Sequence, residues 1–137
     1  MAKQIRRELV LCNFRTLGPR PKKKTTWRKS RPGMSDSHLA DIRKLPCCVC
    51  GRHPGGEAHH LKAGTGERGG ALRSTDRWAV PVCRTDHNEI ERIGSRNEPA
   101  YFERIGIAPL VLAAALWSNR GDLMSMLRVL QTHRDNA

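Results

Sequence analysis

The spacing of apolar residues predicts several short helices. In residues 35–45, apolar side chains recur at helical spacing after Ser35 or Asp36, either of which can cap a helix. Further helices are expected from Thr85 or Asp86 to about Ile93, from a cap at Asn97 through "EPAYFERIG", over 108–118 with Pro109 in the first turn, and over 121–135 as a closing amphipathic helix.

Two short strands are expected between the first and second helices. They cover residues 57–61 and 75–82; in the second, Trp78, Val80 and Val82 would lie on one face and Ala79 on the other. The connecting segment "KAGTGERGGALRS" holds four glycines, which is typical of loops that closely approach a phosphate backbone. The pattern therefore predicts a small α+β fold.

The first 33 residues show no sustained periodicity, and we expect them to form a disordered arm ahead of one domain over 34–137. The longest apolar run, residues 105–117, is shorter than the roughly 20 residues that span a bilayer. We therefore expect a buried helix there and no membrane insertion.

Charge is concentrated in that arm. The 137 residues carry a net charge of +12, and residues 1–45 alone hold 13 Lys and Arg against three acidic residues. Such an arm is typical of nucleic-acid binding, because neutralised phosphates release condensed counterions. A solvated tail, or an arm for anionic membranes or ribosomal RNA, remains open. The arm cations expected to contact nucleic acid are Lys22, Lys23, Lys24, Arg28 and Lys29.

The cysteine pattern predicts a zinc site. The first residues lack a secretion signal, so we expect a cytoplasmic protein, in which clustered cysteines are more often metal ligands than disulfides. Cys47-x-x-Cys50 and Cys83 supply three thiolates for a structural Zn²⁺. Asp86 is the expected fourth ligand, with His53 and Cys48 as alternatives. Packing of the cysteines as small buried hydrophobes is the competing interpretation.

A second constellation involves histidines. His59 and His60 are neighbours on the first predicted strand, so their side chains point to opposite sides and should have different roles. His87 and Glu91 are four residues apart, one turn along the same helix face. A metal bound by His59, His87 and Glu91 would leave His60 beside it as a general base.

The segments "EAHHL", "STDRWAVPVC" and "CRTDHNEIER" resemble the HNH, or ββα-metal, nucleases. With the glycine loop and "YFERIGI", the chain more closely resembles prophage-encoded HNH-type endonucleases of the domain-of-unknown-function 968 type, relatives of a phage recombination-enhancement nuclease. The resemblance covers about residues 38–117. It implies a ββα-metal, treble-clef-like core with a zinc knuckle and flanking helices.

The resemblance also implies roles. His60 would be the base that activates water, and His59, His87 and Glu91 would bind a catalytic Mg²⁺ or Mn²⁺. The family's middle asparagine has no equivalent here, and Asp76 is the expected substitute that orients His60. Asp86 and Glu91 stand where relatives carry other ligands, histidine or cysteine at the first and often histidine at the second.

The expected activity is metal-dependent hydrolysis of DNA, double- or single-stranded, with weak sequence preference, in prophage recombination and with a recombinase filament as a partner. A zinc-stapled nucleic-acid-binding protein without catalysis is the main alternative. A third class is an interaction protein of a prophage replication or recombination complex. The arginines expected to hold phosphates near the site are Arg68, Arg73, Arg77 and Arg84.

Overall fold

The computed structural model describes residues 31–67 and 73–137. Within these ranges it contains five α-helices, one 3-10 helix and a two-stranded antiparallel sheet, which confirms the predicted α+β class. Most of the predicted disordered arm, residues 1–30, lies outside the described residues, as does part of the glycine loop, 68–72. The last three residues of that arm, 31–33, instead form a turn whose Gly33 carbonyl accepts from the Arg77 N–H. The predicted domain boundary after residue 33 stays a prediction.

In their order along the chain, the elements are α2 (Asp36–Lys44), β1 (Glu57–His60), η1 (Asp76–Trp78), β2 (Ala79–Val82), α3 (Arg84–Ile93), α4 (Glu98–Arg104), α5 (Pro109–Ser118) and α6 (Leu123–Asp135). The predicted cap of α2 is confirmed, because the Ser35 side chain accepts a hydrogen bond from the His38 N–H.

The two strands place the paired histidines in the middle of the fold. β1 and β2 are antiparallel, with His59 opposite Val80 and His60 opposite Ala79. All four residues of β2 are buried, while β1 buries only His59. The hairpin is therefore a covered element, and α3 follows it after a single residue, Cys83.

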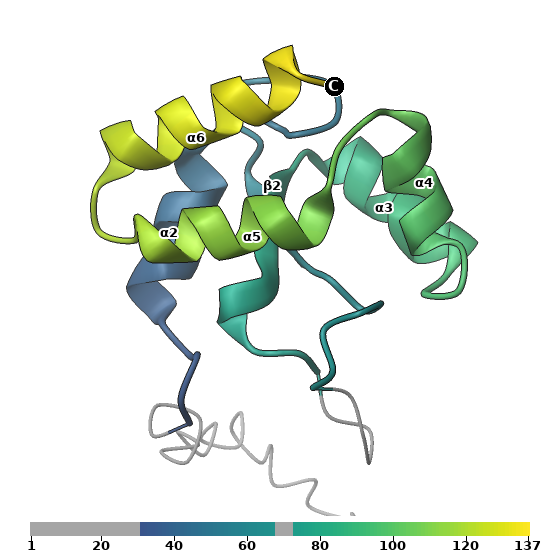
Figure 1. Ribbon diagram of the computed structural model, residues 1–137, viewed down its shortest axis with the longest axis horizontal. Helices are drawn as coiled ribbons and strands as arrows, with labels where there is room; N and C mark the ends of the chain where they lie inside the picture. The colour runs from purple at the N-terminus through teal and green to yellow at the C-terminus, as the bar shows by residue number, and fades with distance from the viewer. Residues whose placement is uncertain (1–30, 68–72) are drawn as a thin grey trace, which may run out of the picture.

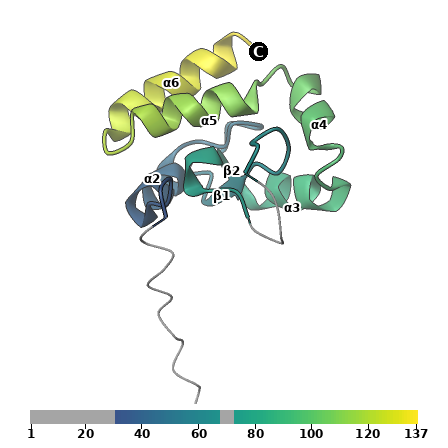
Figure 2. The same cartoon turned by 60° about the horizontal axis from the view of Figure 1, so that its bottom comes forward.

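Helices enclose the hairpin on several sides. α2 and α5 both pack against it, and α6 packs along α5. Figure 1 shows α5 and α6 running side by side, with α3 and α4 together at one end of the molecule. In Figure 2, α5 and α6 form a layer over the hairpin, and α2 and α3 lie on its two sides. The face of β1 that carries His59 contacts α3.

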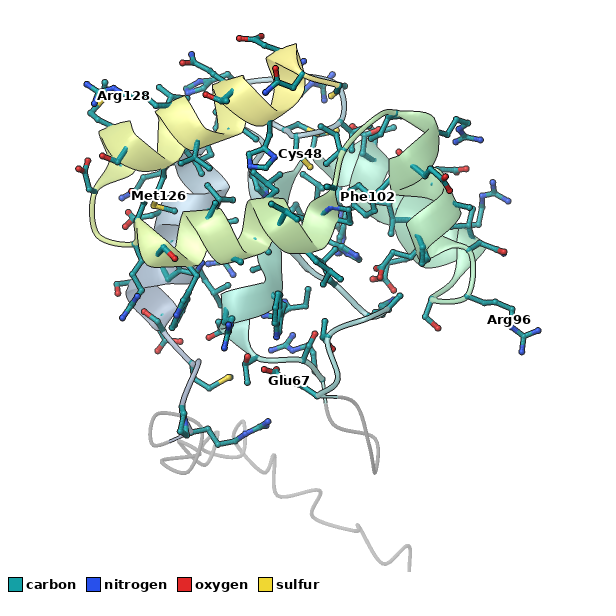
Figure 3. The ribbon with its side chains drawn as sticks, in the orientation of Figure 1. Cys48, Glu67, Arg96, Phe102, Met126 and Arg128 are labelled. Atoms are coloured by element: carbon teal, nitrogen blue, oxygen red, sulfur yellow. The ribbon has the colours of Figure 1, made fainter. Side chains whose placement is uncertain are left out.

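One apolar core joins these layers. Phe102 lies where α4 and α5 meet, and Met126 points inward from α6, whereas Arg96 and Arg128 point outward (Figure 3). Burial of the apolar side chains of this core supplies the main favourable contribution to the free energy of folding. The larger aliphatic and aromatic members of the core that are almost fully buried are Ile42, Leu45, Leu61, Val80, Val82, Ile90, Phe102, Leu112, Leu116, Met126 and Leu130.

The helices α4 and α5 meet at a sharp angle. No single helix in the described ranges is long and apolar enough to cross a membrane, and α4 and α5 meet that criterion only as a pair bent by 87°. The predicted helix over 108–118 is confirmed as α5, with Pro109 at its first position.

The predicted second strand, 75–82, is wrong over its first four residues. Residues 76–78 form the 3-10 helix η1, because their backbone groups bond to nearby turns: the Trp78 N–H donates to the Thr75 carbonyl, and the Arg77 N–H donates to the Gly33 carbonyl. Asp76 is thereby turned into the interior, where it is fully buried. The first strand ends one residue earlier than predicted, at His60.

One predicted helix cap is wrong, and a second is correct in position only. The helix expected to start after Thr85 or Asp86 begins at Arg84, because the Cys83 sulfur occupies the cap position and accepts from the Asp86 N–H. Asn97 is the N-cap residue of α4 as predicted, but its side chain donates to the Ile93 carbonyl and makes no capping hydrogen bond to the helix. The closing helix α6 starts after Asp122, whose carboxylate accepts from the Ser125 N–H.

Candidate metal centres

A cluster of three thiols and a carboxylate lies between the turn after α2 and the start of α3. Cys47 and Cys50 come from a tight turn closed by the Gly51 N–H donating to the Cys47 carbonyl, and Cys83 caps α3. One ligand atom from each of Cys47, Cys50, Cys83 and Asp86 lies within 4.8 Å of all the others.

The spacing of these atoms suits a tetrahedral ion. The Cys50 and Cys83 sulfurs are 3.7 Å apart, close to the ~3.8 Å edge of a tetrahedron with Zn–S bonds of about 2.3 Å. The Asp86 Oδ2 atom lies 3.1 Å from both the Cys47 and the Cys83 sulfur. This cluster could hold a structural zinc, with Asp86 as the fourth donor.

Protonation in the absence of metal follows from the same contacts. Burial and the nearby Asp86 carboxylate raise the pKa of Cys47 to about 12, and burial also raises the pKa of Cys83. Burial alone would raise the pKa of Asp86, but hydrogen bonds from the thiols outweigh it and lower that pKa. Metal binding must therefore displace thiol protons, which makes affinity rise with pH.

The two alternative fourth ligands lie outside this cluster. Cys48 is buried next to it in sequence, and its N–H donates to the Pro81 carbonyl of β2. His53 is exposed. Of the three residues considered from the sequence, only Asp86 brings an atom into the group.

A second cluster joins β1 to α3. His59, His87 and Glu91 each bring one atom within 4.8 Å of the others, and the two imidazole rings are 5.3 Å apart between centroids. The Glu91 Oε1 atom lies 3.6 Å from His59 Nδ1 and 3.9 Å from His87 Nε2. The structure thus brings together the three residues that the sequence predicted as ligands of a divalent ion.

One ring nitrogen of His59, Nδ1, lacks a hydrogen bond among the described residues. Among the described residues, its Nδ1 atom is buried and has no hydrogen-bond partner. A buried polar atom without a partner costs about 1–3 kcal/mol. Because it faces Glu91 and His87, the arrangement fits a cation that would accept its lone pair.

Glu98, a residue that sequence reasoning missed, fixes His59 from the other side. Its Oε1 atom lies 2.7 Å from His59 Nε2, and its Oε2 atom accepts from the backbone N–H groups of Lys62 and Ala63 at 2.8 Å each. Burial would raise the pKa of Glu98, but these hydrogen bonds lower it. An ionised Glu98 only accepts, so Nε2 carries the proton and Nδ1 keeps its lone pair.

His87 has a similar arrangement. Its Nδ1 atom lies 3.4 Å from the Glu57 carboxylate, so its Nε2 atom is the one that faces Glu91. Burial and the neighbouring His59 lower the pKa of His87, which favours the neutral ring that binds metals. The sequence contained no signal for Glu57, which stands two residues before His59 on the same strand.

His60, the next residue of β1, has a different partner. Its Nε2 atom is 2.8 Å from Asp76 Oδ1, and Asp76 Oδ2 accepts from the Ser35 N–H. Burial lowers the pKa of His60, and the bond to Asp76 offsets only part of that effect. The expected contact between His60 and Asp76 is therefore present, and it leaves Nδ1 of a neutral ring as an acceptor.

One helix connects the two clusters. α3 carries Asp86 toward the thiols and, at the next residue, His87 toward His59; Glu91 follows one turn later. Any movement of α3 would therefore disturb both groups.

The cations expected near phosphates have varied surroundings. Arg84 pairs with Glu57 at 2.7 Å, and the Arg77 guanidinium lies 4.8 Å from the Trp78 ring centre. Arg73 is exposed, and its charge acts to lower the pKa of His60. Arg68 and the arm cations lie outside the described residues; the latter are Lys22, Lys23, Lys24, Arg28 and Lys29.

Comparison with known proteins places the chain in a family. Residues 19–118 match the family described as "Protein of unknown function (DUF968)", and the chain belongs to it. The chain is similar to the uncharacterized protein YdfU of Escherichia coli K12, with 32% identity over 62 residues. That segment is 45% of this chain and only 17% of the E. coli protein. No solved structure matches.

Proposed function

We propose that this protein is a metal-dependent endonuclease that hydrolyses DNA phosphodiester bonds with weak sequence preference. The observation that carries the proposal is that two adjacent histidines of β1 have different partners. His59 turns a lone pair toward His87 and Glu91, while His60 is held by the buried Asp76. Two adjacent residues of β1 would therefore supply a ligand of the cation and a neutral imidazole base.

The order of elements supports the same proposal. A hairpin that carries two histidines and a following helix that carries a third is the arrangement of the ββα-metal nucleases that the sequence resembles. The thiol cluster would act as the zinc knuckle that fastens this core. We propose that the fold is of this ββα-metal type.

His59, His87 and Glu91 would hold the divalent ion. Two imidazoles and a carboxylate suit Mn²⁺ better than Mg²⁺, which prefers oxygen ligands. Bound there, the ion would supply positive charge that stabilises the phosphorane and the departing sugar oxygen.

His60 would act as the base. Its Nδ1 atom takes a proton from a water molecule while the water oxygen attacks phosphorus, and the bond from phosphorus to the sugar oxygen breaks. The departing oxygen takes a proton from solvent, so the products are a phosphate monoester and a free hydroxyl. Asp76 keeps the ring in the tautomer that this step needs and stabilises the imidazolium that forms.

Charge supports DNA as the substrate. The net charge of +12, concentrated near the N-terminus, favours a polyanion, and the weak sequence preference is proposed because no recognition helix is evident from the sequence pattern. We propose that the protein acts in the cytoplasm, on phage or prophage DNA during recombination or processing, with a recombinase filament as a partner.

A plasmid cleavage assay tests the proposal. Purified protein with Mn²⁺ or Mg²⁺ should nick or linearise supercoiled plasmid, and the His60→Ala variant should lose this activity while keeping DNA binding and zinc content. His133→Ala is the matched control, because His133 lies in the last turn of α6 and outside both clusters. It should cleave like the wild type.

The alternative function predicts a different result. If the wild type binds DNA but cuts with none of the divalent ions tested, the protein is a zinc-stapled nucleic-acid-binding module instead. Loss of cleavage in both His60→Ala and His133→Ala would also contradict the proposed role of His60.

A further inference from the structure

Lys62 lies two residues after His60 and contacts the histidine cluster. Its ammonium group bonds to Glu91 Oε2, while Glu91 Oε1 faces the imidazoles of His59 and His87. One carboxylate therefore separates a fixed positive charge from the two imidazoles. Neither the spacing nor the composition of the sequence singled out this lysine.

The backbone fixes where Lys62 stands. Its N–H donates to the buried Glu98 carboxylate, which also bonds to His59. The preceding residue, Leu61, is buried, and its N–H donates to the Trp78 carbonyl. The main chain is thus held on both sides, while the Lys62 side chain stays 27% exposed and accessible to a ligand.

The other candidate cations are less well placed. Arg84 is paired with Glu57 on the outer side of His87, and Arg77 stacks on Trp78. Among the cations that the structure describes, Lys62 bonds directly to Glu91, a residue of the histidine cluster.

We propose that Lys62 is a catalytic residue that binds a non-bridging oxygen of the scissile phosphate. This inference rests on the proposed function and adds a second cation to its site. The ammonium donates a hydrogen bond to the phosphoryl oxygen, whose negative charge grows as the attacking water oxygen bonds to phosphorus. Lys62 keeps its proton throughout, and His60 remains the group that accepts one.

Glu91 has a double role in this arrangement. It holds the flexible lysine stem at the cluster before nucleic acid binds, which reduces the entropy lost when the phosphate contact forms. A lysine suits the task because its ammonium is a compact charge with three donors and can bond to Glu91 and a phosphate together.

The test compares Lys62→Met, Lys62→Arg and a matched control. Lys44→Met removes a lysine that is also paired with a carboxylate, Asp41, but on the exposed side of α2. With Mn²⁺ and plasmid, we expect Lys62→Met to cut about 10²- to 10³-fold more slowly, Lys62→Arg to recover part of the loss, and Lys44→Met to match the wild type.

Two further measurements separate phosphate binding from a structural role. In a His60→Ala background, adding Lys62→Met should weaken DNA binding and reduce the slope of log affinity against log salt by about 1. Mn²⁺ binding, followed by calorimetry without DNA, should be retained. Loss of Mn²⁺ binding in parallel with cleavage would overturn the proposal, since Lys62 would then act only by orienting Glu91.

The inference and the proposed function fail in different ways. Wild-type cleavage with an equally fast Lys62→Met variant would reject the role of Lys62 and leave the endonuclease intact. If the wild type does not cleave, the endonuclease proposal falls, and the salt slope in the His60→Ala background still decides whether Lys62 contacts a phosphate. An unchanged slope would reject that contact.

Discussion

His59 Nε2 lies 2.7 Å from Glu98 Oε1, and this contact joins the middle of the hairpin to the first residue of α4. Both side chains are almost fully buried. Because the Glu98 carboxylate also accepts two backbone N–H groups, it is fixed in position and fixes the histidine in turn. Glu98, which orients a candidate metal ligand, is thus held in place by the buried core and backbone of the fold.

Glu98→Gln should weaken binding of Mn²⁺ by about 10- to 100-fold, because an amide no longer holds the His59 proton on Nε2 as firmly. Calorimetric titration of the zinc-loaded protein measures the affinity. Glu103→Gln, an exposed change on the same helix, is the control and should bind like the wild type. Wild-type affinity in a folded Glu98→Gln variant would contradict the role of Glu98.

Cys50→Ala should remove zinc and lower the melting temperature on the order of 10 °C, since the fold is small and a metal ligand is lost. Cys50 is exposed, so the change costs little packing. Cys48→Ala is the informative control: it removes a buried thiol outside the cluster and should keep one zinc per chain. Metal analysis and thermal unfolding check both variants. One equivalent of zinc in Cys50→Ala would exclude the predicted ligand set.

His38 should make stability depend on pH. It is buried against Trp117, and both ring nitrogens lack hydrogen-bond partners among the described residues. Burial lowers its pKa to about 4, although the Asp76 and Asp41 carboxylates act in the opposite direction. In the unfolded chain His38 therefore binds a proton as the pH falls through 6.5, whereas in the folded protein it binds one only near pH 4.

The contribution of His38 to the free energy of unfolding is therefore complete above pH 6.5 and is lost as the pH falls toward 4. The total loss is about 3 kcal/mol. Urea unfolding at several pH values should show a shallower pH dependence for His38→Phe than for the wild type. His133→Gln should keep the wild-type dependence. Identical pH profiles for His38→Phe and the wild type would show that His38 is not the titrating group.

Deleting residues 1–30 should weaken DNA affinity and flatten its salt dependence, because the segment holds ten Lys and Arg and one acidic residue. The deletion stops before Gly33, whose carbonyl accepts from the Arg77 N–H. Zinc content should not change. As a milder variant, glutamine at Lys22, Lys23, Lys24, Arg28 and Lys29 should give part of the effect. An unchanged salt slope would rule out the arm as a phosphate-binding element.

Local spacing in the sequence predicted much of the fold and of the candidate site. The Cys47-x-x-Cys50 turn, the pairing of His87 with Glu91 one helical turn apart, and the opposite orientation of His59 and His60 all depend on the geometry of a single element. The helices α2 and α5 followed from apolar periodicity in the same way. Such relationships extend over only a few residues.

Other features required the folded chain. The 3-10 turn at Asp76 replaced a predicted strand because its backbone bonds to Gly33 and its carboxylate to the Ser35 N–H and His60. Glu57 and Lys62 contact His87 and Glu91 only because β1 and the residues after it lie against α3.

By itself, the sequence determined which residues could be ligands, the turn and helix that present them, and where positive charge is concentrated. The tertiary structure alone decided that Asp86, and not His53 or Cys48, joins the three thiols, and that Glu98, 39 residues after His59, sets the tautomer of that histidine. The physical reason is that a contact between distant residues depends on how the whole core packs, and no local periodicity records it.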